Sequence, residues 1–220
     1  MLEGEALARI TVRGEARRWS VNRIITIGRE FGSGGRELGK RLAEKLGIAY
    51  YDKEILVAIA KKTDFAVDYV QQILSRRPEL YFPITVGQSF YPIVDPILEQ
   101  NNTVYSEQSR IITDMAKKSD CIIVGRCADY ILKDMHPLRL FVYAEMDFKM
   151  DRCRLRAKEH EDLTDRKLTQ QIKRIDKNRA SYYQFYTGRK WGDKLNYDLC
   201  INTSYIPIKE AVDGIAKIFS

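Results

Sequence analysis

The chain has 220 residues, of which 45% are hydrophobic and 30% charged, a balance typical of a soluble globular protein with one sizeable core. It carries 37 lysines and arginines against 30 acidic residues, and the net charge of +7 favours anionic ligands. Because this surplus is spread along the chain, it favours phosphorylated small molecules and disfavours a nucleic-acid surface. No apolar run has the length of a membrane span and no secretion signal is seen, so we expect no membrane partner and a cytoplasmic location.

Two features of the chain receive no predicted function. Residues 1–22 mix charges with short apolar pieces, and we treat them as an N-terminal extension. The four cysteines lack C-x-x-C spacing and the two histidines stand apart, so we expect free thiols and no structural zinc site.

Apolar runs of strand length alternate with helix-like segments from residue 23 onward. The predicted strands are 23–28, 48–51, 121–124, 138–144 and 198–202. The predicted helices are 38–46, 103–118, 127–134, 147–160, 164–184 and 207–219, and residues 53–76 contain further helical pieces with Thr63 or Asp64 as an N-cap. Strands that are apolar on both faces and alternate with helices predict a parallel sheet in a layered α/β fold.

Residues 78–96 differ in composition from the rest, being rich in proline and aromatic residues without a clear period. Such a segment is typical of a surface excursion that closes over a ligand or packs on a partner chain. A packed loop without function is an equal alternative.

A glycine-rich loop follows the first predicted strand. The apolar run Ile24–Ile27 passes into Gly32-Ser33-Gly34-Gly35, and an amphipathic helix follows that ends at Gly47. Strand, glycine loop and helix form the layout in which backbone N–H groups and a helix N-terminus bind phosphate. The alternative is a glycine-rich turn without a ligand.

The loop departs from the usual P-loop pattern G-x-x-x-x-G-K-[ST]. When its last glycine is matched to Gly34, Arg29 stands at the first glycine, Gly35 at the lysine and Arg36 at the hydroxyl residue. The sequence therefore keeps a phosphate cradle without the side chains that normally accompany it.

Polar residues follow the other predicted strands. Ligands of parallel sheets bind beyond the carboxyl ends of the strands, where the glycine loop, Asp52, Gly125-Arg126, 145–147 and 202–204 come together. Arg126 is accordingly a candidate phosphate ligand, with a surface salt bridge as the alternative.

Basic residues recur on two predicted helices. Arg152 and Arg156 share a helix face with Lys149, and this face could close over a nucleotide or simply face solvent. Asp176 and Arg179 are three residues apart and could pair with each other or bind a polar ligand. We interpret the aromatic residues of 182–191 mainly as packing for this helix, with base stacking as the alternative.

With these residues in view, the chain resembles the cytidylate kinase-like family of P-loop proteins from about Arg23 to its C-terminus. The motifs that carry the resemblance are 29–37, 51–52, 124–132, 176–179 and 197–204. The resemblance implies a three-layer P-loop nucleotide kinase fold, with a parallel five-stranded sheet flanked by helices, over residues 23–220. It also implies a nucleoside monophosphate (NMP)-binding region at about 53–105 and a lid at about 147–180.

Cytidylate kinases transfer the γ-phosphoryl group of ATP to CMP or dCMP with Mg²⁺, and the resemblance assigns candidate roles by position. It implies that the donor phosphates bind at Gly32, Ser33, Gly34 and Gly35. It implies that the acceptor binds at Asp52, Arg126, Asp176 and Arg179, and that Arg152 or a neighbour is a catalytic lid arginine.

The departures from the family concern the catalytic groups. The family has its P-loop lysine at the position of Gly35 and a threonine at the position of Glu37. Arg29 or Arg36 could replace the lysine at the phosphates, because arginine is always charged and binds phosphate through two donors. Glu37 could take over metal binding from the hydroxyl, since Mg²⁺ accepts carboxylate oxygen.

The sequence leads to an ATP- and Mg²⁺-dependent phosphotransferase acting on CMP or a related nucleotide, with Arg36, Arg126 and Arg152 as catalytic candidates. The alternative is a nucleotide-binding regulator or pseudokinase that retains the cradle without turnover. An RNA-binding module is a weaker third hypothesis, and a homo-oligomer is left open.

Overall fold

A computed structural model of the protein describes residues 22–75, 96–157 and 164–219. The predicted N-terminal extension up to residue 21 and residues 78–95 of the proline-rich segment lie outside these ranges. The division into NMP-binding and lid regions therefore stays a prediction.

The centre of the molecule is a five-stranded sheet in which every strand pair is parallel and the order is β2-β3-β1-β4-β5. The strands are β1 (Ile24–Arg29), β2 (Ala49–Tyr51), β3 (Cys121–Val124), β4 (Leu138–Tyr143) and β5 (Leu199–Asn202). This arrangement confirms the predicted α/β fold. Because all carboxyl ends lie at one edge, the loops that follow β1, β2 and β3 converge there.

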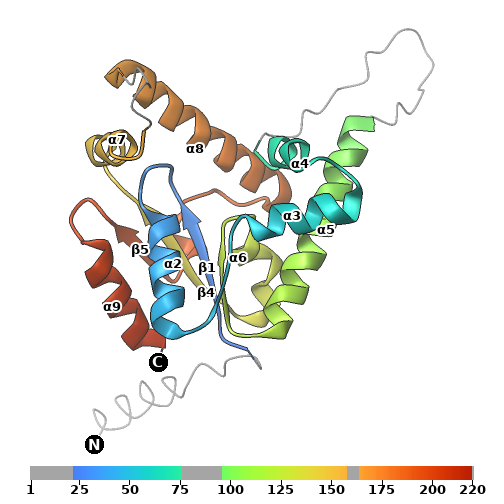
Figure 1. The fold of residues 1–220 in the computed structure, drawn as a ribbon, viewed down its shortest axis with the longest axis horizontal. Coiled ribbons are helices and arrows are strands. Elements are labelled where there is room, and N and C mark those ends of the chain that lie inside the picture. The colour runs from blue at the N-terminus through green and yellow to red at the C-terminus, as the bar shows by residue number, and fades with distance from the viewer. Residues whose placement is uncertain (1–21, 76–95, 158–163, 220) are drawn as a thin grey trace, which may run out of the picture.

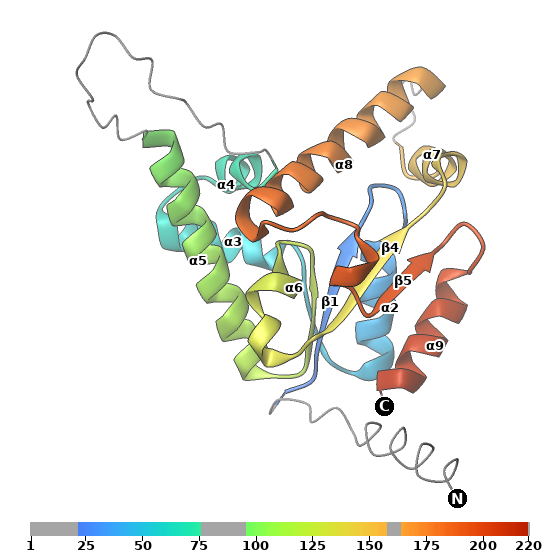
Figure 2. The same cartoon turned by 180° about the vertical axis from the view of Figure 1, so that it is seen from behind.

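Helices cover both faces of the sheet (Figures 1 and 2). Ile25 and Ile27 of β1 pack toward one face, where α2 (Gly35–Leu46) and α9 (Ile208–Phe219) lie. Ile24 packs toward the opposite face, which is covered by α3 (Glu54–Thr63), α5 (Pro96–Lys118) and α6 (Ala128–Ile131). This alternation explains why the strands are apolar throughout. Within the described ranges, no helix combines the length and apolar character needed to cross a membrane.

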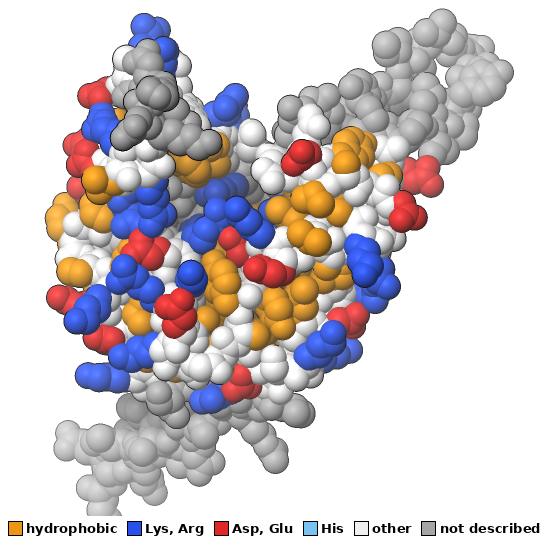
Figure 3. All heavy atoms as spheres, in the orientation of Figure 1, with side chains coloured by type: hydrophobic (Ala, Val, Ile, Leu, Met, Phe, Trp, Pro, Cys, Tyr) orange, Lys and Arg blue, Asp and Glu red, His pale blue; other side chains and the backbone are white. Residues whose placement is uncertain are grey.

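Three further helices lie beyond the carboxyl edge of the sheet, namely α4 (Val67–Ile73), α7 (Met146–Arg154) and α8 (Asp165–Thr187) (Figure 1). Short 3₁₀ helices follow α6 and α8, at Lys133–Met135 and Lys194–Asn196. In the space-filling view, lysine and arginine side chains gather around the end of α2 that lies below α7 and α8 (Figure 3). The fold thus places basic groups at the edge where the glycine loop lies.

Two predicted helix ends can be compared with the structure. Gly47 closes α2 with a φ of 66°, as expected for a C-terminal glycine. The predicted N-cap at Thr63 or Asp64 is wrong, because Asp64 instead ends α3 with a φ of 56°, and α4 begins after Ala66. Aspartate is among the few residues with a side chain that enter this left-handed conformation readily, and it therefore serves here as a stop signal.

Candidate functional site

The glycine loop connects β1 to α2 and is held from both sides. Ser33 is fully buried, and its hydroxyl donates a hydrogen bond to the Glu30 carbonyl at 2.9 Å. The Ser33 carbonyl in turn accepts a hydrogen bond of 2.6 Å from the hydroxyl of Thr203, which follows β5. Gly34 precedes α2 with a φ of 82°, and no side chain caps the first N–H groups of that helix. The loop is therefore a fixed turn that presents a helix N-terminus, the geometry that attracts an anion.

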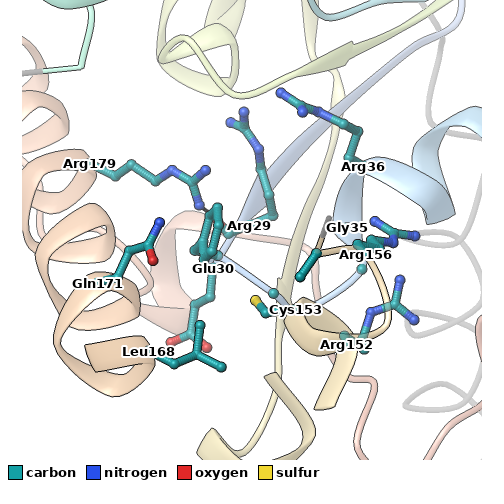
Figure 4. A pocket seen from close by; sticks show the side chains of 14 residues that line it. Arg29, Glu30, Gly35, Arg36, Arg152, Cys153, Arg156, Leu168, Gln171 and Arg179 are labelled. Atoms are coloured by element: carbon teal, nitrogen blue, oxygen red, sulfur yellow. Dashed lines mark hydrogen bonds between the residues drawn. The ribbon is translucent and has the colours of Figure 1, made fainter. Parts of the chain in front are cut away.

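A cavity of about 290 Å³ lies over the loop (Figure 4). It is lined by three of the predicted phosphate-binding glycines, at positions 32, 34 and 35, while Ser33 and Glu37 do not line it. Arg152 of α7 and Arg156, just beyond the end of α7, lie near Gly35, and Arg179 extends from α8 toward Arg29 (Figure 4). The arginines that line this first cavity are Arg29, Arg36, Arg152, Arg156 and Arg179.

Arg29 ends β1 and is the most deeply buried of these cations. Burial, together with the positive charges of Arg179 and Arg126, lowers the pKa of Arg29 to about 9. The side chain fits because two neighbours are glycines. A Cβ atom at Gly35 would lie 2.6 Å from the Arg29 Cβ, and one at Gly125 would overlap the guanidinium. Arg29 is therefore a buried cation close to other positive charges, and a bound anion would stabilise its charged form.

Asp52 follows β2 and binds two of the arginines. Its carboxylate accepts from the Arg36 Nε at 2.5 Å and lies 3.9 Å from the Arg29 Nη2. Asp52 is only 4% exposed and lines neither cavity, so its contact with an acceptor stays a prediction. What the geometry provides is a buried counter-ion that orients Arg36 and Arg29.

A second cavity, of about 510 Å³, adjoins the first. Arg29, Arg36 and Arg179 line both cavities, whereas Arg126 lines only the second. Aromatic side chains form much of the remaining wall, at Tyr182, Tyr183, Trp191 and Tyr197. Two ligand-sized spaces therefore meet at a shared set of three arginines.

Arg126 lies in a backbone turn that few residues adopt. Gly125, Arg126 and Cys127 have successive φ values of 73°, 59° and 54°. The Arg126 carbonyl accepts a hydrogen bond from the Gln108 amide at 3.0 Å, which helps to hold the turn. Burial lowers the pKa of Arg126, and its Nε has no hydrogen-bond partner among the described residues. Strained backbone and an unpaired buried donor are characteristic of a binding site.

Glu37, on the first turn of α2, is surrounded by arginines. Its Oε2 accepts from Arg152 at 2.7 Å and from Arg156 at 2.6 Å, and its Oε1 accepts from Arg41 at 2.7 Å. Burial favours a higher pKa for Glu37, but the hydrogen bond and charge of Arg152, with the other two arginines, hold the pKa below its usual value. Both oxygens are thus engaged, and the metal role of Glu37 stays a prediction.

Asp176 and Arg179 anchor α8 to the glycine loop. Asp176 accepts from the Phe31 N–H at 2.7 Å and lies 3.6 Å from the Lys149 Nζ, and burial raises the pKa of Asp176. Arg179 donates to the Arg29 carbonyl at 3.2 Å and lies 3.4 Å from the Asp176 carboxylate. Arg179 lines both cavities and Asp176 lines neither. The predicted pairing between the two residues is therefore present, together with contacts to the loop.

Sequence reasoning missed two buried contacts. Lys149 lies 2.5 Å from the Glu30 carboxylate, which attaches α7 to the loop. Asp129, whose pKa burial raises, accepts a hydrogen bond of 2.6 Å from the Tyr183 hydroxyl. In both pairs the partners come from distant parts of the chain, so neither periodicity nor spacing could have revealed them.

Comparisons with known proteins find the same fold in solved structures. A solved structure of an uncharacterized protein from Eubacterium ventriosum is 30% identical, with a TM-score of 0.66 over 90% of this chain and 98% of that one. Shikimate kinase from Bacteroides thetaiotaomicron (15% identity, TM-score 0.54, 89% of this chain and 97% of that one) shares the fold. Shikimate kinase from Acinetobacter baumannii in complex with shikimate also shares the fold (13% identity, TM-score 0.51, 91% of this chain and 94% of that one).

A search of curated proteins gives no significant match. The sequence profile of the cytidylate kinase-like family matches residues 24–205, which include the glycine loop, Arg126 and Arg179. Because this match spans most of the protein, the chain belongs to the cytidylate kinase-like family.

Proposed function

We propose that the protein is an ATP-dependent phosphotransferase whose acceptor is a nucleoside monophosphate, with CMP or dCMP as the first candidates. The observation that carries the proposal is that Arg29, Arg36 and Arg179 line both cavities. A phosphoryl group that passes between two ligands needs cations that face both of them. Membership of the cytidylate kinase-like family supports the choice of donor and acceptor.

In this proposal, the ATP phosphates bind at Gly32, Gly34 and Gly35, and the acceptor phosphate binds near Arg126. An acceptor oxygen attacks the γ-phosphorus, the new oxygen–phosphorus bond forms, and the bond to the β–γ bridging oxygen breaks to release ADP. Such a transfer needs positioning and charge stabilisation and no covalent enzyme intermediate. Arg29 and Arg36 supply the positive charge that a P-loop lysine supplies elsewhere, and Arg152 adds charge from α7.

The described residues do not fit a resident Mg²⁺ ion. Both Glu37 oxygens are bound by arginines, and no group of three or more acidic, histidine or cysteine side chains in these ranges has the arrangement of a metal site. We therefore treat Mg²⁺ as an ion that arrives on the ATP phosphates as part of the substrate, and we assign no step to Glu37 through it.

One observation favours a second function, a nucleotide-binding regulator without turnover. Gly35 stands where the family has its lysine, and the space for a side chain there is filled by Arg29. The lysine is thus replaced by a differently placed cation, and the site could retain affinity for phosphate while losing the ability to transfer it.

The test measures ADP formation from ATP with a panel of nucleoside monophosphates, together with nucleotide binding by calorimetry. We expect turnover that depends on CMP or dCMP and falls about 100-fold or more in Arg126→Ala, as for loss of a transition-state donor. Arg110→Ala is the matched control, because Arg110 is exposed on α5 and bonds only Glu107 and Asp114 in the contacts of the described residues. Nucleotide binding without turnover would support the regulator, and failure of every nucleotide to bind would contradict both functions.

A further inference from the structure

Tyr182 of α8 lines the second cavity, and its buried hydroxyl is unused. Tyr182 is 5% exposed, and its hydroxyl oxygen is buried without a hydrogen-bond partner among the described residues. A buried hydroxyl without a partner has lost its hydrogen bonds to water and forms none in the protein, which costs free energy. Native proteins keep few such groups, and those that they keep require an explanation.

The other tyrosines of this helix behave differently. The Tyr183 hydroxyl donates to Asp129 at 2.6 Å, and the Tyr186 hydroxyl donates to the Asn101 carbonyl at 3.2 Å. Packing of α8 therefore does not by itself leave a hydroxyl unpaired. Tyr182 is the tyrosine of α8 whose hydroxyl lacks a partner within the described ranges, and it lines the second cavity. Tyr197, which follows that helix, also lines this cavity with a hydroxyl that is unpaired in the same ranges.

Tyr182 shares the second cavity with another unpaired donor. The Arg126 Nε has no hydrogen-bond partner in the described part of the chain, and Arg126 lines the same cavity. The two groups are close enough that each affects the pKa of the other. Burial raises the pKa of Tyr182 well above its usual value, so its hydroxyl remains protonated and able to donate at neutral pH.

The charges of the cavity indicate what these donors bind. Arg36 and Lys53 add positive charge to its wall, while Asp129, the carboxylate on that wall, already accepts from Tyr183. Unpaired donors in a cationic space favour an oxyanion over a neutral or cationic group. A phosphate monoester, with three terminal oxygens, can accept from both donors at once.

We propose that the Tyr182 hydroxyl is a specificity-determining donor that binds the acceptor's phosphate together with Arg126. This inference rests on the proposed function and adds a residue to it. The consequence for selectivity is that a neutral nucleoside, which lacks the phosphate, leaves two buried donors unpaired. A site of this kind rejects the analogue that lacks the partner group.

The test compares Tyr182→Phe with Tyr186→Phe by thermal unfolding and by calorimetric titration with CMP and cytidine. Tyr182→Phe removes only an unpaired oxygen, so we expect the ligand-free variant to melt at or above the wild-type temperature, whereas Tyr186→Phe melts lower. We expect the Kd for CMP to rise about tenfold or more in Tyr182→Phe, the typical loss for a hydrogen bond to a charged group. Tyr186→Phe keeps the wild-type affinity, and cytidine binds both variants as weakly as wild type.

The readouts separate this inference from the proposed function. If wild type binds CMP and Tyr182→Phe binds it equally well, the role of Tyr182 is refuted and the proposed function stands. A drop in melting temperature as large as that of Tyr186→Phe also refutes it, because the hydroxyl would then have a partner in the folded protein. If wild type does not bind CMP, the proposed acceptor is wrong, and inorganic phosphate becomes the probe. Weaker phosphate binding in Tyr182→Phe then supports the oxyanion site, and unchanged binding refutes it.

Discussion

Arg29 occupies its position because Gly125 has no side chain. The Arg29 guanidinium fills the volume in which a Cβ atom of residue 125 would lie, and Gly125 also has a left-handed φ of 73°. Gly125, which follows β3, therefore determines whether Arg29, at the end of β1, can line both cavities. Glycine at this position is required for steric as well as conformational reasons.

We predict that Gly125→Ala reduces ATP affinity by about tenfold or more, because the new methyl group displaces Arg29 from the cavity and a charge-assisted contact is lost. Gly47→Ala is the matched control, since Gly47 has a similar φ of 66° and nothing lies within 4 Å of its Cβ position. Both variants should lose about 1–2 kcal/mol of stability through left-handed strain. Calorimetric titration with ATP distinguishes them, and equal affinities in the two variants would contradict the role of Gly125.

The position of several site residues could be predicted from the sequence, but the partner of each could not. Arg126 is predicted at the carboxyl edge and lines the second cavity, and Arg179, predicted on a helix beside Asp176, lines both cavities. Asp52 and Asp176 are predicted to bind the acceptor, and this stays a prediction; the structure adds the protein groups with which both are paired. The sequence indicates a packing role for Tyr182 and gives no sign that its hydroxyl is unpaired. Whether a buried hydroxyl finds a hydrogen-bond partner depends on tertiary neighbours, which residue spacing does not specify.

At the level of elements, α7 and α8 are attached to the glycine loop through one buried lysine. The Nζ of Lys149 lies 2.5 Å from Glu30 and 3.6 Å from Asp176, and the Lys149 side chain is only 7% exposed. Lys149 thus connects three elements that are distant in sequence. Gly32 packs directly against it, since a Cβ atom there would lie 2.9 Å from the Lys149 Cβ.

We predict that Lys149→Met lowers the free energy of unfolding by about 3 kcal/mol, because it leaves Glu30 without its cation and Asp176 with Arg179 alone. Lys40→Met serves as the control. Lys40 is exposed on α2 and lies 3.9 Å from Glu44, so its loss should cost less than about 0.5 kcal/mol. Denaturant unfolding of both variants measures the difference, and similar midpoints would show that the buried lysine is not an anchor.

The predicted elements match the structure best where hydrophobic pattern determines them. Residues 121–124 were predicted as a strand and form β3, and the strand predicted at 23–28 is β1 at Ile24–Arg29. The start of α2 was placed late, near residue 38, because two glycines at its N-terminus give no helical signal. The hydrophobic pattern does not predict the strand order, since strand pairing joins residues that lie far apart in the chain.

For the whole molecule, stability in acid depends on the contacts of Glu37. The surrounding arginines lower the pKa of Glu37, so its carboxylate stabilises the fold fully above the ordinary value of 4.5. This contribution is lost as the pH falls below 4.5 toward the lower pKa of the folded state. A neutral side chain at position 37 lacks the contribution at every pH.

We therefore predict that Glu37→Gln melts below wild type at pH 6 and that the two melting temperatures converge as the pH falls below 4.5. Differential scanning calorimetry across this range checks the prediction. A constant difference between the two proteins at all pH values would mean that the charge of Glu37 does not contribute.

The central position of β1 has a consequence for synthesis on the ribosome. This strand leaves the ribosome first, yet both of its neighbours, β3 and β4, follow it by about a hundred residues. At roughly 5–20 residues per second, the nascent chain waits on the order of ten seconds before either partner emerges. During this time an apolar strand is exposed with unpaired edges, a state prone to aggregation. Pairing on both edges of β1 is thus delayed until β4 has been translated, and the sheet is completed only after β5 (Leu199–Asn202) has followed.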